Sequence, residues 1–425
     1  MGILDIPFRK HRLDNGMRVV LSHDATAPVV AVNLWYGVGS RNETPGRTGF
    51  AHLFEHMMFQ GSLHVPKNRH FELVERAGGA LNATTWYDRT NYFETVPSHQ
   101  LELALWLESD RMGWMLPAMD QEKLDNQRDV VKNEKRQRYD NQPYGDWDER
   151  IHRLVYPESH PYHHTVIGSM EDLDAATLDD VAAFFRTFYV PSNAVLTVAG
   201  DFDPERTIDL VEAYFGEIPQ GAPLPDLPGE TELSAVIGDT VRDEVVGEVP
   251  LPRVIVAMRI PPYSSDDFAV AEVTQAVLGT GRASRLYRRL VREKRVAKDV
   301  VTFAFPLLTG AGMLLSWITG YPGSRPEDLE VALTGELEAL GDTAAEEVER
   351  AIAVTETDLV RSLEHAGERA DLMSMFELYF DDPGRLNTEI DRLRAVTPDE
   401  VRSFAAGRLG PDNRAILTYV PEQEP

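Results

Sequence analysis

The 425-residue chain contains no cysteine and no long apolar run. Without cysteine it cannot form disulfides, thiolate metal sites or a cysteine nucleophile, and such a composition suits a reducing compartment. Nowhere do about 18 apolar residues follow one another, so we expect no membrane-spanning helix. The first ten residues include an acid and a proline in place of the apolar core of a signal peptide. We therefore expect a cytoplasmic protein.

Basic residues are scarce relative to acidic ones. The chain has 42 Lys and Arg against 69 Asp and Glu, which gives a formal net charge of −27. Because phosphate backbones require clustered Lys and Arg, nucleic acid is not expected as a partner. An acidic field attracts basic partners instead. With 43% hydrophobic residues the chain can bury substantial cores, and its length predicts two or three domains at roughly 100–200 residues each.

The clearest internal boundary is a segment rich in proline and glycine at residues 219–232. Residues 219–229 alone contain four prolines and two glycines, which cannot continue a helix or a central strand. We interpret the segment as a semi-rigid linker between domains 1–218 and 233–425. The alternative is a long surface loop within one domain.

A repeat supports the two-domain interpretation. Residues 177–198 and 397–419 each contain a threonine followed by acids, a Pro-x-Asn turn and a β-rich run, which is the pattern of a capped helix, a turn and a strand. This similarity indicates a duplicated α/β unit. Further strands are expected over 17–22, 28–36 and 253–259, and helices over 99–115, 119–139, 268–278 and 327–339. Hairpin-like strands mixed with helices favour the α+β class over a doubly wound sheet.

The motif that carries chemistry is His52-x-x-Glu55-His56. On a helix the two histidines lie one turn apart on the same face, so both can reach one ion. Glu55 lies beside them, where it can hold a metal-bound water, as in the inverted His-x-x-Glu-His arrangement of zinc peptidases. Zinc accepts imidazole and carboxylate ligands and keeps one position open in a catalytic site. The alternative is a histidine pair that packs on an amphipathic core helix.

A third metal ligand is offered by Glu134. It continues a partly apolar stripe at helical spacing, formed by Leu124, Gln127 and Val131. A carboxylate on such a stripe is costly unless it is paired, and a cation would pair it. The alternative is a surface acid that pairs with a neighbouring basic residue.

The order of motifs resembles that of the M16 metallopeptidase family, the inverzincin (HxxEH) group that contains pitrilysin, insulysin and the mitochondrial processing peptidases. The motifs that carry the resemblance lie at residues 13–16, 37–43, 52–56, 81–85, 106–111, 134, 160–162, 166–168, 191–194 and 200–201. The resemblance implies two homologous α/β-sandwich domains, each with a mixed, largely antiparallel sheet packed by helices. Together they would form half of a clamshell chamber, in a subunit that pairs into a dimer.

The resemblance also implies roles for individual residues. The zinc ligands, for one zinc per chain, would be His52, His56 and Glu134, and the general base would be Glu55. An edge strand containing Asn82, Ala83 and Thr84 would dock an extended peptide by β-augmentation, unless Asn82 is a turn residue. The implied function is a zinc-dependent endopeptidase that hydrolyses extended or unfolded peptides.

Three residues bear on how completely the chain matches the family. Gln127 stands where catalytic relatives commonly carry a second glutamate. A neutral amide can still form a hydrogen bond there, but it lacks the charge that raises the basicity of the metal ligand. We therefore expect a lower metal affinity. Arg292 matches an arginine that holds substrate, or is only a solvated helix charge. Lys298 stands where a tyrosine is expected to stabilise the oxyanion. Either the lysine replaces the tyrosine electrostatically, or a heterodimer partner supplies the Arg/Tyr pair. The alternative function is a non-catalytic assembly subunit of a larger complex, like the respiratory core proteins that share this fold.

Overall fold

The computed structural model describes residues 4–227 and 233–422, which form two compact units. The first unit comprises the described residues of the ranges 1–135, 165–227 and 360–388. The second comprises those of 136–164, 228–359 and 389–425. Neither unit is a continuous stretch of the sequence.

The first unit is built on a six-stranded mixed sheet. Its strands are β1 (Arg9–Arg12), β2 (Arg18–His23), β3 (Val29–Tyr36), β4 (Ala80–Thr85), β5 (Thr90–Pro97) and β6 (Ala194–Gly200). The spatial order is β1-β2-β6-β3-β5-β4, with β2 and β6 parallel and the other neighbours antiparallel. Almost every residue of β3 and β6 is buried, as expected for central strands covered on both faces. β4 lies at the edge of the sheet.

The second sheet repeats this topology. Its strands are β7 (Thr240–Gly247), β8 (Arg253–Ile260), β9 (Asp299–Phe305), β10 (Gly312–Thr319) and β11 (Arg414–Pro421). The order β7-β11-β8-β10-β9 matches β2-β6-β3-β5-β4, including one parallel pair at the same place. Capping boxes at Thr177 and Thr397 begin the helices α7 (Leu178–Phe188) and α14 (Pro398–Arg408), which lead into β6 and β11. The duplication and the mixed α+β class predicted from the sequence are thereby confirmed.

Helices cover both sheets. In the first unit they are α1 (Phe50–Met57), α2 (Arg69–Arg76), α3 (Leu101–Trp114), α4 (Gln121–Lys135), α6 (Met170–Ala175), α7, α8 (Pro204–Phe215) and α12 (Ala366–Phe380). In the second unit they are α5 (Trp147–Val155), α9 (Phe268–Gly279), α10 (Pro326–Glu338), α13 (Glu389–Ala395) and α14, while α11 (Ala345–Ser362) contributes residues to both units. The strands and helices expected from the sequence are present with ends shifted by a few residues; α4, for example, ends at Lys135 and a π-helical turn follows it. In the described ranges, no helix is both long and apolar enough to span a membrane.

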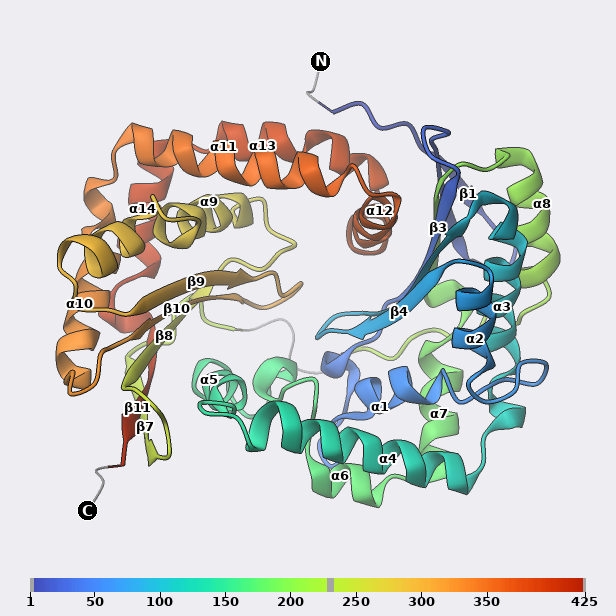
Figure 1. Ribbon diagram of the computed structural model, residues 1–425, viewed down its shortest axis with the longest axis horizontal. Helices are drawn as coiled ribbons and strands as arrows, with labels where there is room; N and C mark the ends of the chain where they lie inside the picture. Colours follow the sequence, from blue (N-terminus) through green and yellow to red (C-terminus); the bar gives the residue numbers. More distant parts are fainter. Residues whose placement is uncertain (1–3, 228–232, 423–425) are drawn as a thin grey trace. The chain divides into compact units, whose positions relative to one another are not determined.

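Two helices are exchanged between the halves of the sequence. α12, from the second half, packs on β3 and β6 of the first sheet, on the face opposite α3 (Figure 1). α5, from the first half, packs on β7, β8 and β11 of the second sheet. Each sheet has two apolar faces to cover, and each exchanged helix covers one of them. The compact units therefore do not coincide with the contiguous domains 1–218 and 233–425 expected from the sequence. That division describes the two copies of the duplicated sequence, and it stays a prediction. Residues 219–227 form neither helix nor strand, and residues 228–232 of the expected linker lie outside the described residues.

Candidate metal centre

The helix that carries the His-x-x-Glu-His motif is fixed at its start by two residues. Gly49 has φ +86°, and a Cβ there would lie 2.8 Å from the carbonyl oxygen of Ile167, so glycine is required. The Glu43 carboxylate accepts the backbone N–H groups of Gly49 and Ala51, each at 2.8 Å. These bonds satisfy donors of the first turn and place a negative charge at the positive end of α1. The buried apolar residues of α1 anchor its other face.

The two histidines and Glu134 converge at one point. Glu134 Oε2 lies 3.4 Å from His56 Nε2 and 3.7 Å from His52 Nε2, and one ligand atom from each residue lies within 4.8 Å of the other two. Ligands that surround zinc tetrahedrally at about 2.1 Å lie about 3.4 Å from one another. The side chains are 12–22% exposed, so the cluster stays accessible from one side. Two imidazoles and a carboxylate at these distances fit a single zinc ion.

α4 delivers Glu134 to this point because it packs directly on α1. Gln127 lies two turns earlier on α4 and is buried, with only 6% of its surface exposed. Its side-chain amide donates to Asn126 Oδ1 at 2.9 Å.

Glu55 is held by a residue that sequence reasoning did not assign. The Thr85 hydroxyl donates to Glu55 Oε2 at 2.6 Å. Burial raises the pKa of Glu55, and this effect outweighs the opposing influence of the Thr85 hydrogen bond and of His56. Strand alternation places Thr85 and Thr84 on opposite faces of β4, but the sequence does not show which face is turned towards α1.

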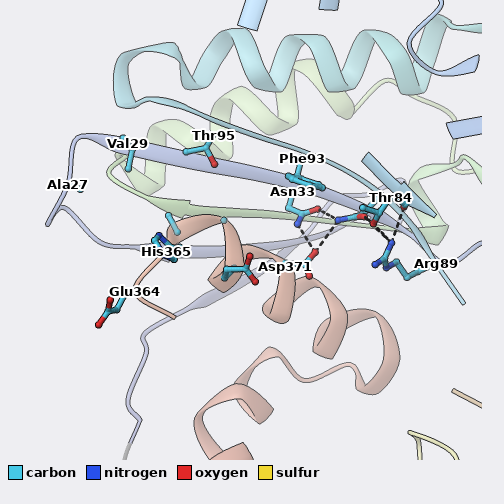
Figure 2. A pocket seen from close by; sticks show the side chains of 14 residues that line it. Ala27, Val29, Asn33, Thr84, Arg89, Phe93, Thr95, Glu364, His365 and Asp371 are labelled. Atoms are coloured by element: carbon cyan, nitrogen blue, oxygen red, sulfur yellow. Dashed lines mark hydrogen bonds between the residues drawn. The ribbon is translucent and has the colours of Figure 1, made fainter. Parts of the chain in front are cut away.

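The three residues expected to dock a peptide lie in the edge strand β4, which pairs with β5 on one side only. Asn82 lies inside this strand, so its interpretation as a turn residue is wrong. Its side-chain oxygen accepts the backbone N–H of Ala83 at 2.9 Å. The Thr84 hydroxyl donates to Asn91 Oδ1 at 2.5 Å, and Asn91 donates in turn to Asp371 of α12 at 3.0 Å (Figure 2). The exchanged helix thus braces the edge strand.

A buried charged cluster lies between the first sheet and α3. The Arg111 side chain is 1% exposed, forms an ion pair with Glu108, and lies 4.2 Å from the ring centroid of Tyr92. Burial and the neighbouring Glu108 raise the pKa of Glu94 well above its ordinary value. Glu94 can therefore stay protonated and neutral beside the Arg111–Glu108 pair, which limits the cost of burying the cluster.

Arg292 and Lys298 belong to the second unit. Arg292 is exposed in the π-helical segment Tyr287–Glu293 and lines a pocket of about 450 Å³ together with Arg282, Arg288 and Arg350. Lys298 is exposed immediately before β9, and its backbone N–H donates to the carbonyl oxygen of Thr319 at 2.8 Å.

Comparisons with known proteins identify similar families and relatives. The family model described as "Insulinase (Peptidase family M16)" matches residues 18–164, and the one described as "Peptidase M16 inactive domain" matches residues 175–355. Zinc protease PqqE of Helicobacter pylori is 29% identical over 399 residues, which cover 92% of this chain and 88% of that protein. The uncharacterized zinc protease YmxG of Bacillus subtilis is 25% identical over 406 residues, with 93% and 94% covered.

Solved structures share the fold over nearly the whole chain. The crystal structure of a protease from Helicobacter pylori matches with a TM-score of 0.90 and 26% identity, covering 98% of this chain and 100% of that one. A chain of complex III2 from Candida albicans matches with a TM-score of 0.80 and 15% identity, covering 97% and 95%, which shows the fold alone. Two M16 family models match consecutive parts of the chain, and similar relatives cover more than nine-tenths of it: the chain belongs to peptidase family M16.

Proposed function

We propose that this protein is a zinc-dependent endopeptidase that hydrolyses extended or unfolded peptides. The observation that carries the proposal is the convergence of His52, His56 and Glu134 at distances that suit tetrahedral zinc, with Glu55 on the same helix. Relatives named zinc proteases support the same chemistry.

The chemistry is divided between the ion and the side chains. His52, His56 and Glu134 would hold one zinc per chain, and zinc when bound supplies a Lewis acid for the peptide carbonyl and lowers the pKa of a water molecule. Glu55 accepts the proton of the attacking water and returns it to the leaving amine nitrogen. Thr85 holds one carboxylate oxygen of Glu55, so the other is free to take that proton.

The peptide would bind as an additional strand beside β4, at Asn82, Ala83 and Thr84. Main-chain hydrogen bonds of this kind accept almost any sequence, provided that the segment is extended. A folded segment has its backbone groups already paired, so the substrate must be extended or unfolded. Arg292 is also proposed to contribute to substrate binding.

A second candidate is a non-catalytic assembly subunit. The fold shared with a chain of complex III2 and the "inactive domain" description of the second family match favour it. The complete His52, Glu55, His56 and Glu134 set favours the peptidase.

Metal analysis and a quenched-peptide library distinguish the two candidates. We expect near-stoichiometric zinc in the wild type and in Glu55→Gln, because Glu55 is not a ligand. Peptide hydrolysis should fall in Glu55→Gln by at least ~10²–10⁴-fold, the usual cost of losing a general base. A zinc-free wild type that cleaves no peptide, alone or with a partner, would identify an assembly subunit.

Two further parts of the proposal concern assembly and location. We propose a dimer, either with a second copy or with a family member that carries the Arg/Tyr pair, and solution molar mass measurement would test it.

The cytoplasmic location stays a prediction from the N-terminal residues, which cell fractionation would test.

A further inference from the structure

A groove of about 580 Å³ runs along the face of the first sheet that α12 packs on. It is bordered by β3, β5, the end of β4 and residues 364–371, which comprise the turn before α12 and the beginning of that helix. In Figure 2, Asn33 and Phe93 lie on the sheet side of this groove and Glu364 and His365 near the start of the helix. All residues that line it belong to the first unit, and none of them belongs to the metal cluster.

The floor of the groove is a fixed carboxylate. Asp371 Oδ1 accepts hydrogen bonds from Asn33 Nδ2 at 2.9 Å, from Trp35 Nε1 at 2.9 Å and from Asn91 Nδ2 at 3.0 Å. Asn33 and Asn91 are 2% and 1% exposed, so these donors are themselves held rigidly. Since all three donors are neutral, they orient the carboxylate without cancelling its charge.

The lining of the groove carries an excess of negative charge. Glu364 lies in the turn before α12 and Glu368 in the first turn of that helix, and both are exposed. Glu368 precedes Asp371 by three residues on the helix. The cation in the lining, Arg89, is engaged with the sheet at the β4 end of the groove. Its guanidinium donates to the Thr84 carbonyl oxygen at 2.9 Å and lies 4.9 Å from the Trp35 ring centroid. Three carboxylates against one guanidinium favour a cationic ligand.

The same groove has an apolar wall formed by Val29 and Phe93. A lysine or arginine side chain combines an apolar stem with a cationic head, so it can pack along such a wall and place its charge at the carboxylates. An acidic side chain would be repelled by the carboxylates. A purely apolar side chain would desolvate them without pairing them.

We propose that this groove binds a lysine or arginine side chain of the peptide substrate, outside the stretch that pairs with β4. The proposal rests on the proposed peptidase function and adds a substrate preference to it. β4 links the two places, because Thr84 lines the groove whereas Thr85 donates to Glu55 on the opposite face. A peptide paired with this strand therefore has the metal cluster on one face of the sheet and the groove on the other.

The test compares quenched peptides that are identical except for lysine or norleucine at one position, which is scanned on both sides of the cleavage point. At the best position we expect the wild type to cleave the lysine peptide with a kcat/KM about tenfold higher. The double variant Glu364→Gln/Glu368→Gln should lose this preference and keep its activity on the norleucine peptide. Both glutamates are exposed, so folding should be unaffected. The matched control is Glu217→Gln, an exposed carboxylate just after α8, which should keep the preference.

A charge reversal and a binding measurement complete the design. Glu364→Lys/Glu368→Lys should prefer a peptide with glutamate at the scanned position. Binding of fluorescently labelled peptides to Glu55→Gln, measured by anisotropy, reports on the groove without cleavage. Lysine-dependent binding without any cleavage by the wild type would support the groove and overturn the peptidase function. Cleavage with the same lysine preference in the wild type and the double glutamine variant, or with no preference in either, would overturn the groove alone.

Discussion

The hydroxyl of Thr85 donates a 2.6 Å hydrogen bond to the carboxylate of Glu55. Thr85 is the last residue of the edge strand β4, and Glu55 lies on the helix that carries both histidines of the metal cluster. The strand proposed to bind the peptide therefore also holds the proposed general base. In the proposed mechanism, this one side chain would couple substrate position to base orientation.

Replacing Thr85 with valine tests this coupling. Valine keeps the shape of threonine and removes the hydroxyl, so Glu55 loses a donor that orients it. A hydrogen bond to a charged group contributes about 1.5–3 kcal/mol, so kcat should fall about 10–100-fold, with KM and zinc content close to wild type. Thr85→Ser should recover most of the activity because it restores the hydroxyl. Equal kcat values for the threonine and valine forms would leave Thr85 with a packing role only.

The carboxylate of Glu134 is the ligand that the structure brings from a second helix. Glu134→Gln keeps the size of the side chain and removes its charge. Loss of a residue that only hydrogen-bonds to a metal ligand costs ~10–100-fold in metal affinity. Because Glu134 is proposed to bind the zinc itself, we expect the affinity for zinc to fall by more than this. Competition with a chelator of known affinity measures the change. Glu122→Gln, an exposed change on the same helix, is the control and should bind zinc like the wild type. Equal affinity in both variants would contradict the ligand assignment.

Acid sensitivity is expected from His70, which is 1% exposed. Burial, reinforced by the charge of Arg111, lowers the pKa of His70 to about 4. Because the folded pKa lies below the unfolded value of about 6.5, its contribution to stability is complete above pH 6.5 and is lost as the pH falls towards 4. The loss amounts to about 3 kcal/mol for a shift of this size.

Denaturant unfolding at several pH values checks this expectation. His70→Phe removes the titration and keeps a ring at this position, so its free energy of unfolding should depend less steeply on pH between 6.5 and 4 than that of the wild type. A constant change in the free energy of unfolding caused by the substitution does not affect its dependence on pH. Other titrating groups contribute equally to both proteins. Parallel pH profiles would show that His70 does not contribute to acid unfolding.

Parts of the site that depend on local spacing could be predicted from the sequence. One helical turn places His52 beside His56 whatever the rest of the fold does, and the stripe on α4 marked Glu134 as an acid in need of a partner. The duplicated sheet was also predictable, because each copy repeats a capped helix, a turn and a strand.

Contacts between distant segments could not be predicted in this way. Asp371 bonds to Asn91 across 280 residues, and no local pattern shows that α12 covers the sheet of the other half of the sequence. The same limit applies to Thr85, because its partner depends on which face of β4 is turned towards α1. The exchange of α5 and α12 is likewise set by which apolar faces remain to be covered, a property of the assembled sheets.

The last prediction concerns Lys298, which stands before β9 where relatives in the family are expected to carry a tyrosine. Loss of one preorganised donor typically costs about 10²–10³ in turnover, so the isolated chain should cleave peptides slowly and a partner subunit with the Arg/Tyr pair should accelerate it by a factor in this range. If the missing hydroxyl is the cause, Lys298→Tyr should recover part of the loss without a partner, whereas Lys298→Met should not. Turnover by the isolated wild type as fast as by any mixture would contradict partner dependence. A further loss of kcat in both variants, with zinc content unchanged, would instead identify the lysine ammonium as the donor that stabilises the oxyanion. A homodimer would then be sufficient for full activity.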